Sequence, residues 1–171
     1  MIFLNKVISE IKSDEIEKTI SSDNFPWYWN EHTLSSSNTD SFMFTHTLFS
    51  DDKISSSYYY LVEPILSSLQ SQTKIEIKKI IRIKVNLLTN LFLTEKQTEL
   101  EIHTDNDIDN YKSFIYYVID SDGDTVIYDD SIQSINPRKN TGILFKSNIK
   151  HRGSSPQNHK RRIVINFVFE V

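Results

Sequence analysis

The sequence predicts a mainly β protein with N-terminal helices, built as a β-sandwich or jelly roll. In the second part of the chain, short segments rich in β-branched and aromatic residues carry polar residues at alternate positions, which is typical of strands. Turn-forming residues separate these segments at regular spacing. No helical pattern lies between them, although a parallel βαβ sheet would require one. The strands are therefore expected to form a sandwich or jelly roll.

Helices are predicted only in the first part of the chain. Apolar residues at helical spacing predict an amphipathic helix from about Lys6 to Ile20. A second helix is predicted over Tyr58–Leu69, and Pro64 either kinks or divides it. Between the two, Phe42–Phe49 alternates well enough to be a strand.

The strand candidates of the second part follow one another closely. They are Ile75–Ile77, Ile80–Leu88, Leu100–His103, Ser113–Ile119, Thr125–Tyr128, Thr141–Phe145 and Arg162–Phe169. The segments between them contain turn residues such as Asp122-Gly123-Asp124. The chain holds only three glycines, so each is expected at a tight turn or a close approach of two backbones.

Length and composition indicate one globular domain. The chain of 171 residues is long enough to bury a sizeable core, and its 38% hydrophobic and 25% charged residues exclude a disordered chain. We expect residues 1–171 to form a single domain. Within it, a helical and loop region of about residues 1–73 would pack on a β core of about residues 74–171.

Charge and cysteine content exclude several functional classes. The net charge is −4 and the pI is near 5.7, which argues against a broad nucleic-acid-binding face. The chain has no cysteine, which excludes disulfides, thiolate zinc sites, iron–sulfur clusters and a cysteine nucleophile. Any metal must therefore be held by histidine and carboxylate. The N-terminus does not resemble a signal peptide and no apolar run could span a membrane, so a cytoplasmic protein without membrane partners is expected.

One group of residues is suited to metal binding. His103 and Asp105 lie two positions apart, and side chains at that spacing share one face of a strand. His151 precedes the last strand and could supply a third ligand from a neighbouring strand. Two histidines and one carboxylate leave three positions open on the ion, as mononuclear iron(II) oxygenases require for a bidentate co-substrate and dioxygen. The His-x-Asp pair alone is also compatible with a solvated turn.

The basic residues at the start of the last strand favour the interpretation of the His-x-Asp pair as part of a metal site over that of a solvated turn. Arg162 enters an otherwise apolar strand, and a buried guanidinium is costly unless it meets an anion. A bidentate pair with the far carboxylate of 2-oxoglutarate would meet that need. The alternative is that Arg161 and Arg162 both flank the strand in solvent.

The second half of the chain contains, in order, Arg82–Leu87, His103–Asp105, Phe114–Val118, Asp122–Thr125, Leu144-Phe145, His151 and Arg162–Phe167. This succession resembles the iron(II)/2-oxoglutarate-dependent oxygenases, in particular their prolyl-hydroxylase-like branch with small phage and marine-bacterial homologues. No single piece is specific, and the order of the pieces carries the resemblance. It implies a core of the double-stranded β-helix (jelly-roll) type.

The resemblance also implies roles for individual residues. His103, Asp105 and His151 would bind Fe(II), with 2-oxoglutarate and dioxygen as co-substrates and ascorbate as a supporting reductant. No catalytic residue beyond these ligands is implied. The residues implied in 2-oxoglutarate binding are Arg162 and Tyr117 at the C5 carboxylate, with Asn86, Thr125 and Asn166 along the pocket.

The implied reaction is hydroxylation of an unidentified substrate with release of succinate and carbon dioxide. A protein side chain is the favoured substrate, a small molecule is the other candidate, and nucleic acid is not favoured. The alternative function is a cupin-like metal-binding or structural jelly-roll protein without oxygenase activity. Two features depart from the family pattern. Gly123-Asp124 stands where many members have Gly-Gly, and the interval from His151 to Arg162 is a little longer than usual, so that Arg161 competes with Arg162 as the anchor of the co-substrate.

Overall fold

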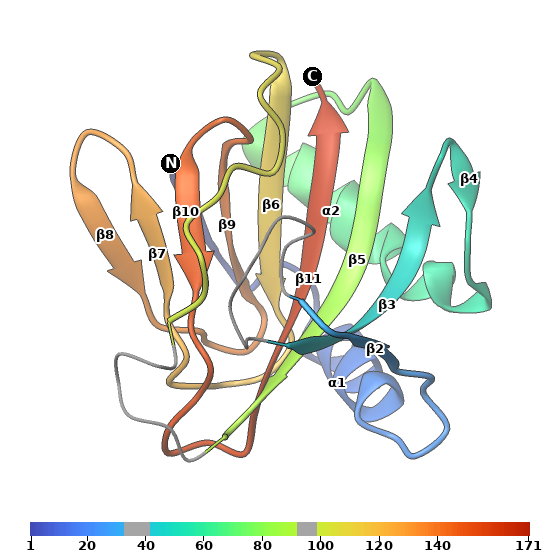
Figure 1. The fold of residues 1–171 in the computed structure, drawn as a ribbon. Coiled ribbons are helices and arrows are strands. Elements are labelled where there is room, and N and C mark those ends of the chain that lie inside the picture. Colours follow the sequence, from blue (N-terminus) through green and yellow to red (C-terminus); the bar gives the residue numbers. More distant parts are fainter. Residues whose placement is uncertain (33–41, 92–98) are drawn as a thin grey trace.

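The computed structural model describes residues 1–32, 42–91 and 99–171, which form two antiparallel sheets (Figure 1). The strands are β1 (Ile2–Asn5), β2 (Tyr28–Asn30), β3 (Met43–Ser50), β4 (Lys53–Ile54), β5 (Lys79–Thr89), β6 (Tyr111–Tyr117), β7 (Thr125–Tyr128), β8 (Ile132–Ile135), β9 (Thr141–Lys146), β10 (Lys150–Gly153) and β11 (Arg161–Glu170). The large sheet has the order β1-β9-β6-β11-β5-β3-β2, with β4 paired to β3, and the small sheet has the order β10-β7-β8. The predicted fold class, mainly β with a jelly-roll core, is confirmed.

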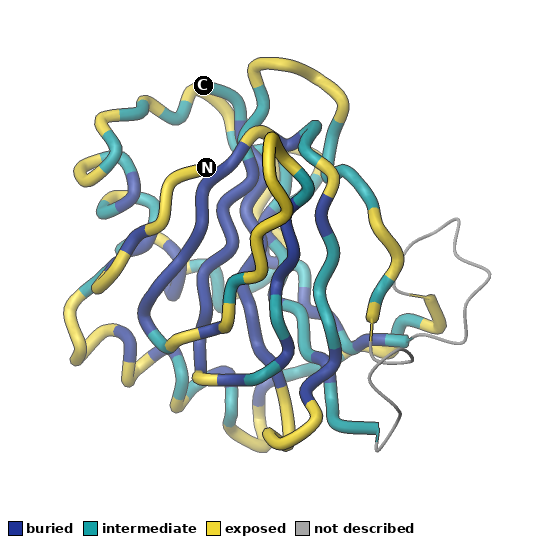
Figure 2. The backbone as a smooth tube through the Cα atoms, turned by 90° about the vertical axis from the view of Figure 1, so that its left-hand side faces the viewer, coloured by how far each residue is buried: buried dark blue, intermediate teal, exposed yellow. Residues whose placement is uncertain are grey.

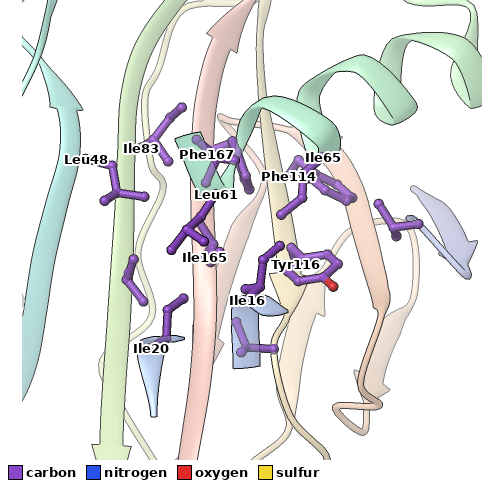
Figure 3. Packing of buried hydrophobic residues seen from close by; sticks show 14 of the residues in the cluster. Ile16, Ile20, Leu48, Leu61, Ile65, Ile83, Phe114, Tyr116, Ile165 and Phe167 are labelled. Atoms are coloured by element: carbon purple, nitrogen blue, oxygen red, sulfur yellow. The ribbon is translucent and has the colours of Figure 1, made fainter. Parts of the chain in front are cut away.

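Two helices cover one face of the large sheet. They are α1 (Glu10–Ile20) and α2 (Glu63–Thr73), and α2 passes behind the central strands in Figure 1. Their apolar side chains meet those of the sheet in the main core (Figure 3), which includes Ile16, Ile20, Leu48, Leu61, Ile65, Ile83, Phe114, Tyr116, Ile165 and Phe167. The central strands are consequently buried along most of their length (Figure 2).

The small sheet covers part of the opposite face. Ile127 of β7 packs there against Tyr117, Ile143 and Val164 of the large sheet, in a second apolar cluster. Strand β11 is therefore buried on both faces, which explains its nearly continuous apolar sequence.

Alternation along β11 separates core residues from site residues. Ile163, Ile165 and Phe167 belong to the core under the helices. Arg162 and Asn166, which lie on the other face of the strand, line a cavity between the two sheets.

Local capping decides where the helices begin. Ser9 accepts a hydrogen bond from the backbone N–H of Lys12 (3.4 Å), so α1 begins at Glu10, later than predicted. Pro64 lies in the first turn of α2, where its missing N–H is not needed. It divides the predicted second helix into a 3-10 helix, Ser57–Leu61, and α2.

Some strands differ from the sequence prediction. Ile75–Ile77 forms no strand, and Leu100–His103 contributes only one isolated bridge, between His103 and His151. The short strands β1, β2, β4, β8 and β10 were not predicted, because each has at most one buried residue and therefore lacks the apolar pattern that burial imposes. In the described ranges, no helix is long and apolar enough to cross a membrane.

Candidate metal centre

His103 and His151 face each other across an antiparallel bridge beside the small sheet. The backbone N–H of each donates to the carbonyl oxygen of the other, with N–O distances of 2.9 and 2.8 Å. Their ring centroids lie 4.5 Å apart. The backbone N–H of Asp105 donates to the carbonyl oxygen of Ser147 at 3.0 Å. Backbone hydrogen bonds therefore hold all three predicted metal ligands in place.

The three side chains converge on one point. One ligand atom each from His103, Asp105 and His151 lies within 4.8 Å of the others, and Nε2 of His151 is 3.6 Å from Oδ2 of Asp105. Within the described part of the chain, this is the only group of at least three His, Cys, Asp or Glu residues that could hold a metal ion. Two imidazoles and one carboxylate form a donor set that suits iron(II) with open coordination positions.

Hydrogen bonds select the tautomer of both histidines. Nδ1 of His103 lies 3.1 Å from the carbonyl oxygen of Glu101, and Nδ1 of His151 lies 3.1 Å from that of Ile149. A carbonyl oxygen can only accept, so both Nδ1 atoms carry the proton and both Nε2 atoms keep a lone pair. Burial also lowers the pKa of His151 and thereby favours its neutral, metal-binding form.

The carboxylate of Asp105 is held by three other side chains. Ser113 Oγ donates to Oδ2 at 2.6 Å, and Arg82 Nη2 and Asn166 Nδ2 donate to Oδ1 at 2.9 and 3.2 Å. Burial by itself raises the pKa of Asp105, but the histidines, Arg82 and the Ser113 hydrogen bond outweigh it and hold the pKa below its usual value. Asp105 is therefore ionised and oriented as a ligand must be.

A cavity of about 130 Å³ opens beside these ligands, with Arg162 in its wall. Arg162 is 5% exposed, and it donates from Nε to the carbonyl oxygen of Gly123 and from Nη2 to Thr125 Oγ1, both at 2.7 Å. Both acceptors are neutral, and no described carboxylate forms an ion pair with this guanidinium. A buried cation with only neutral partners fits an anionic ligand.

Gly123 allows the close approach of Arg162. A Cβ atom at this position would lie 2.3 Å from the carbonyl oxygen of Ser154 and 2.9 Å from Cδ of Arg162. The loop after β6 can therefore pass over the guanidinium only with glycine at this position, as the scarcity of glycine predicts.

The hydroxyl proton of Thr125 is not used by either of the hydrogen bonds that this side chain forms. Its Oγ1 accepts from the Tyr117 hydroxyl at 3.0 Å and from Arg162 Nη2 at 2.7 Å. A hydroxyl oxygen has two lone pairs, so both are used and its own proton remains to be donated. Tyr117 itself is fully buried and reaches the cavity wall through Thr125. A carboxylate oxygen beside Arg162 would accept the proton of Thr125.

Two asparagines complete the wall. Asn86 and Asn166 both line the cavity, and the Oδ1 atom of each is buried without a described hydrogen-bond partner. Buried acceptors of this kind are costly in a closed protein, so they indicate a place where a ligand or water binds.

The structure thus places most of the predicted site residues around one cavity, and it distinguishes between the two candidates for the anchor of the co-substrate. Arg162 lies in the cavity wall, whereas Arg161 is exposed and donates to Ser21 Oγ at 3.1 Å. Sequence reasoning missed Arg82 and Lys84, which also line the cavity from β5. Their spacing, alternating with Asn86, was the only signal in the sequence that could have indicated them.

Comparisons with known proteins agree with this geometry. A family model described as the 2OG-Fe(II) oxygenase superfamily matches residues 89–170. A prolyl hydroxylase from Trichoplax adhaerens, solved with a peptide fragment of hypoxia inducible factor, is 15% identical with a TM-score of 0.73, covering 99% of this chain and 82% of that one. A 2OG-Fe(II) oxygenase family protein from Burkholderia pseudomallei is 10% identical with a TM-score of 0.72, covering 99% and 84%.

A viral collagen prolyl hydroxylase from Paramecium Bursaria Chlorella virus-1 is 14% identical with a TM-score of 0.61, covering 99% of this chain and 95% of that one. At such identities these structures establish the fold only. No curated protein matches the sequence. The family model spans the candidate ligands His103, Asp105 and His151 together with Arg162, and the donor set and buried guanidinium suit iron(II) and 2-oxoglutarate. Residues 89–170 of this chain therefore match the 2OG-Fe(II) oxygenase superfamily, and the protein is a 2-oxoglutarate- and iron(II)-dependent dioxygenase.

Proposed function

We propose that this dioxygenase is a hydroxylase in which His103, Asp105 and His151 hold the iron. The observation that carries these roles is the convergence of one ligand atom from each residue within 4.8 Å. The neutral Nε2 atoms and the ionised carboxylate are already in the states that a divalent cation requires.

The proposal places the C5 carboxylate of 2-oxoglutarate at Arg162. The guanidinium lies in the cavity wall without an ion-pair partner among the described residues, and the free proton of Thr125 lies next to it. Tyr117 orients Thr125 from behind, and the amides of Asn86 and Asn166 supply polar groups along the cavity. In this arrangement Arg162 fixes the end of the co-substrate that is remote from the metal.

When bound, iron(II) and 2-oxoglutarate supply the oxidation: dioxygen converts 2-oxoglutarate to succinate and carbon dioxide with one oxygen atom, and the other becomes the hydroxyl group of the substrate. The residues of the chain bind and orient the reactants. Arg82, Ser113 and Asn166 keep Asp105 ionised and in place, and Arg162 and Thr125 hold the co-substrate. The apolar residues Ile115 and Val164 line the cavity and limit the entry of water.

We favour a side chain of a peptide or protein as the substrate. The cavity of about 130 Å³ is small beside the roughly 300–1,000 Å³ of sites that enclose a whole small molecule. After the co-substrate has bound, a substrate could insert only its reacting end and would remain largely outside. The Trichoplax adhaerens neighbour, whose structure contains a peptide fragment, is consistent with such a substrate.

The first test requires no knowledge of the substrate. Purified protein would be mixed anaerobically with iron(II) and 2-oxoglutarate, and the visible charge-transfer band of the chelated co-substrate would be recorded. We expect the band in the wild type and in the exposed control His159→Ala, and its loss in His103→Ala and His151→Ala. A folded, metal-loaded wild type without the band would contradict these roles and favour a metal-binding or structural jelly roll without oxygenase activity.

A further inference from the structure

Strand β5 directs two cations into the cavity that holds the candidate metal ligands. Arg82, Lys84, Asn86 and Leu88 occupy alternate positions of the strand, and all four line the cavity. Lys84 pairs in register with Asn166 of β11, whose amide donates to Asp105. Lys84 therefore lies beside the metal ligands without being one of them.

The two cations differ in their partners. Arg82 forms an ion pair with Asp105, with 2.9 Å between Nη2 and Oδ1. Lys84 is half-buried and forms no hydrogen bond or ion pair with any described residue. Burial, and then the charge of Arg82, lower the pKa of Lys84 to about 8, so the ammonium group is still mostly protonated at neutral pH. A half-buried ammonium group without a partner is costly unless a ligand supplies an anion.

The metal and the co-substrate do not supply that anion. Asp105 is already paired with Arg82, and in the proposed function the two carboxylates of 2-oxoglutarate are directed at the metal and at Arg162. The other carboxylate in the cavity wall, Glu101, is exposed and forms no ion pair within the described ranges. The loaded cavity therefore retains a cation at Lys84 without a counter-charge.

We infer that Lys84 binds a carboxylate of the primary substrate, so that the enzyme acts on a carboxylate-bearing molecule at a carbon close to that group. This inference rests on the proposed function. Lys84 lies in the wall of the same small cavity as the metal ligands, so a carboxylate bound there holds the neighbouring carbon near the metal. An acidic side chain of a peptide and a small free acid share this chemistry.

The experiment uses acetate as a probe and manganese(II) as a paramagnetic metal. Protein loaded with manganese(II) and 2-oxoglutarate is titrated with acetate, and with acetamide as its neutral isostere, and the broadening of each methyl proton signal is recorded. We expect acetate to be broadened far more than acetamide. Lys84→Gln should reduce the acetate effect by about tenfold, the range of one charged hydrogen bond. Lys78→Gln, a control at an exposed lysine just before β5, should leave it unchanged.

Two outcomes would overturn the inference: equal broadening of acetate and acetamide in the wild type, or acetate broadening that Lys84→Gln leaves unchanged. The methylene signals of 2-oxoglutarate, recorded in the same samples, report co-substrate binding separately. If the methylene signals stay narrow in the wild type, 2-oxoglutarate does not bind and the proposed function fails. The broadening of acetate by protein loaded with manganese(II) alone then still tests whether Lys84 binds a carboxylate. A titration with N-acetyl-aspartate N-methylamide then distinguishes a peptide substrate from a small free acid. If this compound binds more strongly than acetate, the result supports a peptide, and if the two bind equally, it supports a small acid.

Discussion

Arg82 and Asp105 form an ion pair inside the candidate metal centre, with 2.9 Å between Nη2 and Oδ1. The side chain of Asp105 is 2% exposed and that of Arg82 is 36% exposed, so the pair joins a buried anion to a more exposed cation, and both residues line the cavity. Ser113 and Asn166 donate to the same carboxylate. The anionic ligand is thus charged and oriented by the protein itself, which reduces the reorganisation that metal binding requires.

This pair predicts that Arg82→Gln destabilises the metal-free protein by about 1–3 kcal/mol, because a buried carboxylate loses a charged hydrogen bond. Manganese(II) should remove most of the deficit, since the metal replaces the lost positive charge at Asp105. Urea unfolding with and without metal measures both effects. Arg161→Gln is the control, because that exposed side chain donates only to Ser21 among the described residues. An equal deficit with and without metal would count against the electrostatic role.

Arg162→Lys should weaken 2-oxoglutarate binding about 10- to 100-fold, because lysine keeps the charge but cannot make the paired hydrogen bonds of a guanidinium. The affinity of the iron(II)-loaded protein for 2-oxoglutarate, followed by its charge-transfer band, gives the comparison. Arg161→Lys should match the wild type, since Arg161 lies outside the cavity. If the two variants bind alike, Arg162 is not the anchor.

The buried strands β7 and β11 could be predicted from the sequence because their residue pattern is set by burial. Strand β7 was predicted with its observed bounds, and β11 within one residue at each end. Both strands lie where apolar side chains pack on a sheet, and they therefore consist mainly of apolar residues that can be recognised in the sequence. Strand β10 has the sequence Lys-His-Arg-Gly and is a strand because β7 and the segment around His103 supply its hydrogen bonds. Such pairing depends on tertiary structure.

The site was predictable in its ligands but not in its surroundings. His103 and Asp105 stand in a short motif, and the pattern of Arg162 in an apolar strand indicated a buried cation. Arg82 and Lys84 look like the solvent-facing residues of an amphipathic strand. The tertiary fold decides whether the face of β5 that carries these two residues is covered by water or by a second sheet. The pattern of a single strand does not contain this information.

Thr125→Val should impair both stability and co-substrate binding. The substitution leaves the Tyr117 hydroxyl and Arg162 Nη2 without their shared acceptor in a buried place, which costs about 1–3 kcal/mol of stability. It also removes the proton that we assign to the C5 carboxylate, so 2-oxoglutarate affinity should fall. Thr125→Ser keeps the hydroxyl and should restore most of that affinity. Chemical unfolding and 2-oxoglutarate titration of both variants make the comparison, and weak binding by Thr125→Ser would show that the methyl group matters more than the proton.

Asp122 predicts an acid-dependent loss of stability at the loop that leads into β11. Its carboxylate accepts hydrogen bonds from the backbone N–H groups of Gln157, Asn158 and His159 and from the Asn158 side chain. Burial alone raises the pKa of Asp122, but the hydrogen bonds from Asn158 and His159 outweigh it and lower the pKa to about 2. This depressed pKa means that the folded state binds the proton more weakly than the unfolded state does. The stabilisation is therefore complete above about pH 4 and is lost as pH falls towards 2.

Asp122→Asn should consequently destabilise the protein at neutral pH by about 1–2 kcal/mol, after allowance for the partial exposure of the carboxylate. The difference from the wild type should shrink between about pH 4 and pH 2, because protonation removes the same charge that the substitution removes. Urea unfolding at several pH values measures this, with the exposed Asp130→Asn as a control that should show little effect. A difference that stays constant with pH would mean that Asp122 acts through shape and not through its charge. The loop ahead of Arg162 would then be held by packing and not by the charge of Asp122.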